Sequence, residues 1–145
     1  MVSRLNTIIA NHQHRSGALL PILHDIQHAF GYVPDEAVPL IAKQLNLSRA
    51  EVHGVISYYH HFRQTPPGKH VVHVCCAEAC QSVGGEELAE HAKEKLSADN
   101  ITLEPVYCLG LCAIGPAIRI DETKLHARVT PEKFDALIDV LGECA

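Results

Sequence analysis

The chain has 145 residues, of which 47% are hydrophobic and 20% charged, so it can bury a core and is not expected to be disordered. Its 12 basic and 17 acidic residues give a formal net charge of -5 with histidine neutral, which disfavours binding to nucleic acid. No apolar run approaches the roughly 20 residues of a membrane span, and residues 1–15 lack the apolar stretch of a signal peptide, so we expect a cytoplasmic protein without a membrane span.

The first half of the chain is predicted to be helical. Apolar residues from Leu19 to Phe30 recur with the spacing of one helix face, and Gly31 follows at the position where a left-handed residue ends many helices. A second helix is expected from Pro34 to Asn46, and Ser48-Arg49-Ala50-Glu51 has the pattern of a capping box that begins a third. A weaker helical pattern covers residues 4–14.

A boundary between two modules is predicted at Gln64-Thr65-Pro66-Pro67-Gly68, because two prolines and a glycine cannot continue a helix. Helices with one apolar face must pack on one another or on something else, and with little room for a core of their own they tend to use the surface of a neighbour. We therefore expect residues 1–65 to be a helical segment that docks on a partner subunit. Residues 66–145 are expected to form a separate domain, which contains all six cysteines.

The second half has the pattern of a small α/β domain. A β-branched strand at 71–74 precedes a helix at 84–96, and the strand expected at 101–107 contains a proline that favours an edge position or an early break. Alternating apolar residues between Ile118 and Val129 predict a hairpin. A last helix is expected to begin at Pro131, so the order of elements is β-α-β, hairpin, α.

Four of the six cysteines form two spaced pairs, Cys75 with Cys80 and Cys108 with Cys112. Each pair follows a predicted strand, and two strands of one sheet would bring both pairs to the same edge, where thiolates can bind a soft metal. Neither pair has the C-x2-C spacing common in zinc sites, which favours an iron–sulfur cluster. At this point zinc and a disulfide or free-thiol site remain open alternatives.

The other two cysteines are not expected to join the site. Adjacent residues of an extended chain point to opposite sides, so at most one of Cys75 and Cys76 can be a ligand, and Cys76 is predicted to be a small buried side chain. Cys144 follows the last helix and is predicted to be an exposed free thiol. Nearby glycines can supply backbone N–H groups to the sulfur atoms: Gly84, Gly85, Gly110 and Gly115.

Several segments carry a resemblance to a known family: Val74-Cys75 with Cys80, Gly84-Gly85-Glu86-Glu87-Leu88, and Val106-Tyr107-Cys108-Leu109-Gly110-Leu111-Cys112 with Gly115-Pro116. They resemble the thioredoxin-like [2Fe-2S] ferredoxin family, the family of the 24 kDa subunit of respiratory complex I. In the first half, Phe30-Gly31-Tyr32-Val33-Pro34 is similar to that family's N-terminal helical segment. The resemblance implies an α/β fold, with an N-terminal helical bundle segment followed by a thioredoxin-like [2Fe-2S] ferredoxin domain.

The same resemblance implies a ligand set and a role. Cys75 and Cys80 would hold one iron of a single [2Fe-2S] cluster, and Cys108 and Cys112 would hold the other. The implied role is one-electron relay or storage beside the flavin of an NADH-binding subunit, in a complex that also contains a larger iron–sulfur or molybdenum catalytic subunit. FMN, NAD and the molybdenum cofactor would be bound by these partner subunits, and no catalytic residue is expected in this chain.

The choice of parent complex depends on a few spacer residues. The segment Ala77-Glu78-Ala79-Cys80-Gln81 is most similar to the γ subunit of soluble, molybdenum-containing, NAD-dependent formate dehydrogenases. Alternatives within the family are the equivalent subunits of NADH:quinone oxidoreductase and of bidirectional hydrogenase. An alternative of another class is a zinc-stabilised interaction module without redox function.

Overall fold

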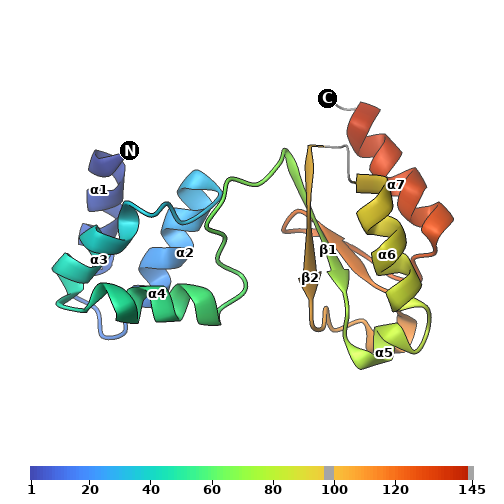
Figure 1. Cartoon of the computed structure of the whole chain (residues 1–145), viewed down its shortest axis with the longest axis horizontal. Helices are drawn as coiled ribbons and strands as arrows, with labels where there is room; N and C mark the ends of the chain where they lie inside the picture. Colours follow the sequence, from blue (N-terminus) through green and yellow to red (C-terminus); the bar gives the residue numbers. More distant parts are fainter. Residues whose placement is uncertain (97–99, 144–145) are drawn as a thin grey trace. The chain divides into compact units, whose positions relative to one another are not determined.

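The structure is a computed structural model that describes residues 1–96 and 100–143. The chain divides into two compact units, Met1–Pro67 and Gly68–Ala145 (Figure 1). This division lies close to the module boundary expected from the proline-rich stretch. None of the helices in the described ranges combines the length and the apolar character that a membrane crossing requires.

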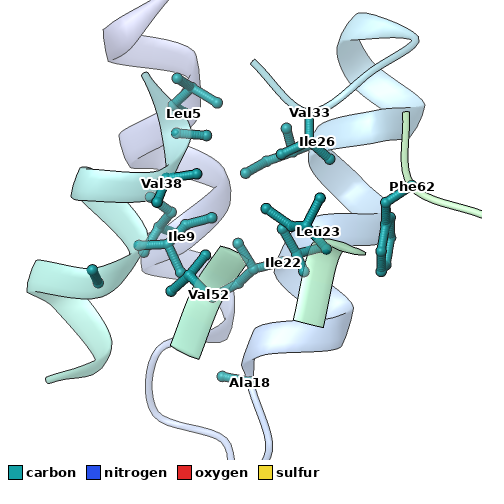
Figure 2. Close-up of a cluster of buried hydrophobic side chains, with 14 residues drawn as sticks. Leu5, Ile9, Ala18, Ile22, Leu23, Ile26, Val33, Val38, Val52 and Phe62 are labelled. Atoms are coloured by element: carbon teal, nitrogen blue, oxygen red, sulfur yellow. The ribbon is translucent and has the colours of Figure 1, made fainter. Parts of the chain in front are cut away.

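The first unit, all of whose residues are described, is a bundle of four helices: α1 (Val2–His12), α2 (Leu19–Phe30), α3 (Ala37–Leu45) and α4 (Arg49–Tyr58). Figure 2 shows the core that their apolar faces bury together, with Leu5, Ile9, Ile22, Leu23, Ile26, Val38 and Val52 among its members. The expectation that these helices have little room for a core of their own is therefore wrong, because every helix contributes side chains to one cluster.

Local sequence signals set the ends of these helices. Gly31 ends α2 in the left-handed conformation, with a φ of 83°. The capping box before α4 is formed, since the Ser48 N–H donates to the Glu51 carboxylate at 2.7 Å and the Glu51 N–H donates to Ser48 Oγ at 3.1 Å. One start differs from the prediction: α3 begins at Ala37, because the residues from Pro34 form a turn, in which the Ala37 N–H donates to the Pro34 carbonyl at 2.9 Å.

The second unit is a mixed sheet with helices. Its described elements are β1 (His70–Cys75), α5 (Glu78–Gln81), α6 (Gly85–Lys95), β2 (Ile101–Val106), the 3-10 helix η2 (Cys112–Ile114), β3 (Ile118–Ile120), β4 (Lys124–His126) and α7 (Pro131–Glu143). The strand order is β2-β1-β3-β4, with β1 parallel to β2 and antiparallel to β3. Pro105 therefore lies on an edge strand, as predicted, where the N–H that proline lacks is least needed.

Helices α6 and α7 cover one face of this sheet (Figure 1). The core between them contains Val72, Val74, Ile118 and Ile120 from the strands, Leu88 and Ala92 from α6, and Phe134 and Ile138 from α7. The predicted α/β domain after an N-terminal helical segment is thus confirmed. The second strand of the hairpin is shorter than predicted, because Arg128 has a positive φ of 49° and interrupts the extended chain before Val129.

Candidate metal centre

The ends of β1 and β2 bring both cysteine pairs to one edge of the sheet. The last residues of these parallel strands, Cys75 and Val106, are register partners, and the Cys76 N–H donates to the Val106 carbonyl at 2.8 Å. Beyond this point α5 carries Cys80 and η2 begins at Cys112, and the two short helices contact each other. Parallel pairing, which places the carboxyl ends of neighbouring strands side by side, thus brings the two pairs near one another.

Cys75 and Cys80 form the buried pair, with exposed fractions of 1% and 2%. The Cys75 N–H donates to the Ala117 carbonyl at 3.0 Å, and the single turn of α5 returns the Cys80 thiol to hydrogen-bond distance of the Cys75 thiol. Burial and then this bond raise the pKa of Cys80, whereas a hydrogen bond from the Ala117 backbone lowers it. A metal cation in place of the proton would offset the cost of a buried thiolate.

Cys108 and Cys112 form the exposed pair, and their Sγ atoms lie 3.6 Å apart. The Gly110 N–H donates to Cys108 Sγ at 3.3 Å, and this bond, followed by the one to Cys112, lowers the pKa of Cys108. The pKa of Cys112 is raised, first by its hydrogen bond to Cys108 and then by the nearby negative charge of the Cys108 thiolate. Two thiolates bound to one tetrahedral ion at about 2.3 Å are about 3.8 Å apart, so this pair has a suitable spacing for a shared metal.

The two pairs also interact with each other. The charges of Cys75 and Cys112 both raise the pKa of Cys80, and Cys75 contributes to the raised pKa of Cys112. In residues 1–96 and 100–143, no group of three or more His, Cys, Asp or Glu side chains is arranged to hold a metal ion by itself. The four thiols thus form two neighbouring pairs. Such an arrangement suits a cluster of two irons, which takes two thiolates on each iron.

Glycines allow the chain to approach the buried pair closely. A Cβ added at Gly115 would lie 3.2 Å from Cys80 Sγ and 3.2 Å from Val83 Cγ2. One added at Gly85 would lie 2.6 Å from the Cys80 carbonyl oxygen. A side chain at either position would crowd Cys80. The two glycines therefore allow the backbone to pack closely against this cysteine.

Some features of the site differ from the sequence prediction. Among the glycines, Gly110 makes the expected N–H bond to sulfur. The backbone donor at Cys80 is Ala117. This donor was not predicted, because no sequence motif marks a single small residue. Cys76 is half-buried rather than buried, and its Sγ lies 3.6 Å from the Val74 carbonyl oxygen. The prediction of an exposed thiol at Cys144 falls outside the described residues.

Comparison with known proteins connects this geometry to a family. The sequence model of the thioredoxin-like [2Fe-2S] ferredoxin family matches residues 5–142. The chain is 32% identical to the NADP-reducing hydrogenase subunit HndA of Solidesulfovibrio fructosivorans, covering 86% of this chain and 77% of that protein. It is also 32% identical to a subunit of the NADH-quinone oxidoreductase of Escherichia coli, over 84% of this chain and 78% of that protein.

Other matches are to longer proteins. A subunit of the NADH-quinone oxidoreductase of Mycobacterium tuberculosis is 31% identical over 92% of this chain, which spans 56% of that protein. Among solved structures, one chain of an NAD+-reducing [NiFe]-hydrogenase superposes with a TM-score of 0.64 at 24% identity, over 81% of this chain and 22% of the hydrogenase chain. The last similarity concerns the fold alone.

Proposed function

Because this chain belongs to the thioredoxin-like [2Fe-2S] ferredoxin family, we propose that Cys75, Cys80, Cys108 and Cys112 hold one [2Fe-2S] cluster, and that the protein is an electron-transfer subunit of an NAD-linked oxidoreductase complex. The observation that carries the proposal is the meeting of a buried and an exposed thiol pair at the ends of β1 and β2. The family match favours this interpretation over a zinc-stabilised module.

The residues of this chain would divide the work of holding the cluster. When bound, the cluster supplies one-electron transfer. Cys75 and Cys80 would hold it from the interior, where burial excludes water, and the exposed pair would hold it where a partner's redox centre can approach. Hydrogen bonds from Gly110 and Ala117 would stabilise negative charge on the sulfur atoms and so help to set the reduction potential.

Metal analysis of the protein tests the cluster. We expect anaerobically purified protein to be red-brown, to contain equal amounts of iron and acid-labile sulfide, and to give the electron paramagnetic resonance signal of a one-electron-reduced [2Fe-2S] centre. A colourless protein with one zinc ion and no sulfide would overturn the proposal.

For the parent complex we propose an NAD-dependent formate dehydrogenase, in which this chain is the γ subunit beside a flavin- and NADH-binding subunit and a molybdenum catalytic subunit. The spacer Ala77-Glu78-Ala79-Cys80-Gln81 supports this choice. The relatives named above belong to hydrogenases and to NADH-quinone oxidoreductases, which are the competing choices. The electrons would enter or leave as hydride at the partner's flavin.

Purification from the native source through a tag on this chain tests the choice of complex. The expected result is copurification, from the cytoplasmic fraction, of a molybdenum-containing subunit and NAD reduction that depends on formate. Copurification of a nickel-containing subunit with hydrogen-dependent activity, or of membrane subunits with quinone reduction, would identify one of the alternatives instead.

Residues 1–65 are proposed to dock on a partner subunit. Because this segment has a core of its own, a missing core is no reason for it to dock. The proposal is supported instead by two exposed aromatic side chains, Tyr58 at 76% and Tyr59 at 43% exposure. Hydrogen exchange of the isolated chain and of the complex separates the outcomes. Docking predicts slower exchange in α4 within the complex, whereas equal rates throughout residues 1–65 would contradict it.

A further inference from the structure

A cavity of about 500 Å3 opens between α6 and the edge strand β2. Helix α6 packs against β1, and the neighbouring edge strand β2 has no fully buried residue. The lining is mostly apolar and is formed by Val74, Ala89, Leu96, Ile101, Leu103 and Pro105, together with four residues that carry polar groups. Its volume falls within the range of about 300 to 1,000 Å3 that small-molecule sites occupy.

The polar groups of the cavity are Cys76, Lys93, Glu104 and Tyr107. Glu104 is engaged, since its Oε2 lies 3.1 Å from His73 Nε2. Within the described ranges, Lys93 has no carboxylate at ion-pair distance, whereas Lys95, at the end of α6, pairs with Asp139. The ammonium group of Lys93 is close enough to Cys76 to influence that thiol electrostatically. The cavity therefore combines an apolar wall with a cation that is available to an anion.

We propose that this cavity binds a small amphipathic anion, with its apolar ring or chain between α6 and β2 and its carboxylate or sulfonate on Lys93. Val74 and Cys76, which line the cavity, flank Cys75 in the sequence, so the ligand would lie beside the strand end that carries the proposed cluster. The inference goes beyond electron transfer and does not depend on it, because the lining residues include none of the four proposed cluster ligands.

Two probes that differ in one group test this assignment. 1-Anilinonaphthalene-8-sulfonate carries an apolar ring system and an anion, and N-phenyl-1-naphthylamine has the same rings without the anion. Binding of each to the purified cluster-containing protein is measured by isothermal titration calorimetry. We expect the sulfonate to bind with one site per chain, and more tightly than the neutral analogue.

Variants of two lysines separate the cavity from general attraction to positive charge. Lys93→Gln should weaken sulfonate binding about fivefold to tenfold and leave the neutral probe unchanged, since only the charge-assisted contact is lost. The matched variant Lys124→Gln changes the charge equally on exposed β4, outside the cavity, and should leave both probes unchanged. Ala89 lies on α6 and lines the cavity, so Ala89→Trp fills the space between α6 and β2 and should reduce binding of both probes by at least about tenfold.

Three results would overturn the assignment: no saturable binding of the sulfonate, the same affinity loss in Lys93→Gln and Lys124→Gln, or unaltered binding in a folded Ala89→Trp variant. If Ala89→Trp does not fold, the comparison of Lys93→Gln with Lys124→Gln still decides the test. Iron and sulfide content of the same samples reports separately on the cluster, so failure of one proposal is distinguishable from failure of the other.

Discussion

The Sγ atoms of Cys108 and Cys112 lie 3.6 Å apart, and the Gly110 N–H donates to Cys108 Sγ at 3.3 Å. This separation is close to the value of about 3.8 Å for two thiolates on one tetrahedral ion. Contacts within this loop thus help to hold the exposed pair near metal-binding geometry. The buried pair depends instead on the packing of α5 and on the chain around Ala117.

Alanine substitution of each cysteine tests the proposed ligand set. Cys75→Ala, Cys80→Ala, Cys108→Ala and Cys112→Ala should each lose the cluster or retain it with greatly reduced stability, because an iron would lack one thiolate. Cys76→Ala and Cys144→Ala should keep it. Iron, acid-labile sulfide and visible absorbance of anaerobically purified variants measure the outcome. Loss in Cys76→Ala together with retention in Cys108→Ala would contradict the assignment.

Alkylation of cluster-free protein should distinguish the thiols by reactivity. The Gly110 bond lowers the pKa of exposed Cys108, whereas burial raises the pKa of Cys80, and the thiolate is the form that reacts. With limiting iodoacetamide at neutral pH, peptide mass spectrometry should find Cys108 modified before Cys80. Faster modification of Cys80 would show that its burial is absent in the cluster-free protein.

Gly115→Ala should destabilise the cluster domain by about 1 to 2 kcal/mol, because the new Cβ would press on Cys80 Sγ and Val83 Cγ2 at 3.2 Å. Backbone strain does not contribute, since Gly115 has a φ of -64° that alanine adopts freely. Gly54→Ala is the control: it lies in α4 with nothing within 4 Å, and should stabilise that helix by about 0.5 to 1 kcal/mol. Urea unfolding and the lifetime of the cluster absorbance report the effects, and parental stability of Gly115→Ala would refute the crowding.

Asp121→Asn should reduce the loss of folding stability that occurs at acidic pH. Burial raises the pKa of Asp121, but bonds from His70 Nδ1 at 3.0 Å and the Val71 N–H at 3.1 Å outweigh it and lower the pKa below its ordinary value. Since the folded-state pKa is depressed, the stabilisation is present above the unfolded pKa of about 3.9 and is lost as the pH falls through the folded pKa. Discounted for partial exposure, it is about 1 kcal/mol.

Urea unfolding of the two proteins between pH 3 and pH 7 checks this prediction. The stability difference should shrink below about pH 4, where Asp121 takes up a proton. Asp139→Asn, which removes a largely exposed ion pair with Lys95, is the matched control and should have a much smaller effect. An Asp121→Asn difference that grows as the pH falls would have the wrong sign.

Much of the fold could be predicted because its signals are local. The capping box of Ser48 and Glu51 requires only residues that are three apart, and the end of α2 requires only a glycine at position 31. The edge position of Pro105 follows from the hydrogen bond that proline cannot donate. Whether α1 to α4 pack on one another or on something else stayed open, because the apolar stripe of one helix does not specify its packing partner; the structure shows one shared core.

Two spaced cysteine pairs, each after a predicted strand and with glycines nearby, can be recognised from the sequence alone. The tertiary structure sets the burial of Cys75 and Cys80, the exposure of Cys108 and Cys112, and the backbone donor that Ala117 supplies to Cys80. It also decided that Lys93 stands beside an open edge of the sheet. Spacing along the chain sets which side chains one turn or strand can present. Burial and hydrogen bonding depend on segments far apart in the sequence, which only strand pairing brings together.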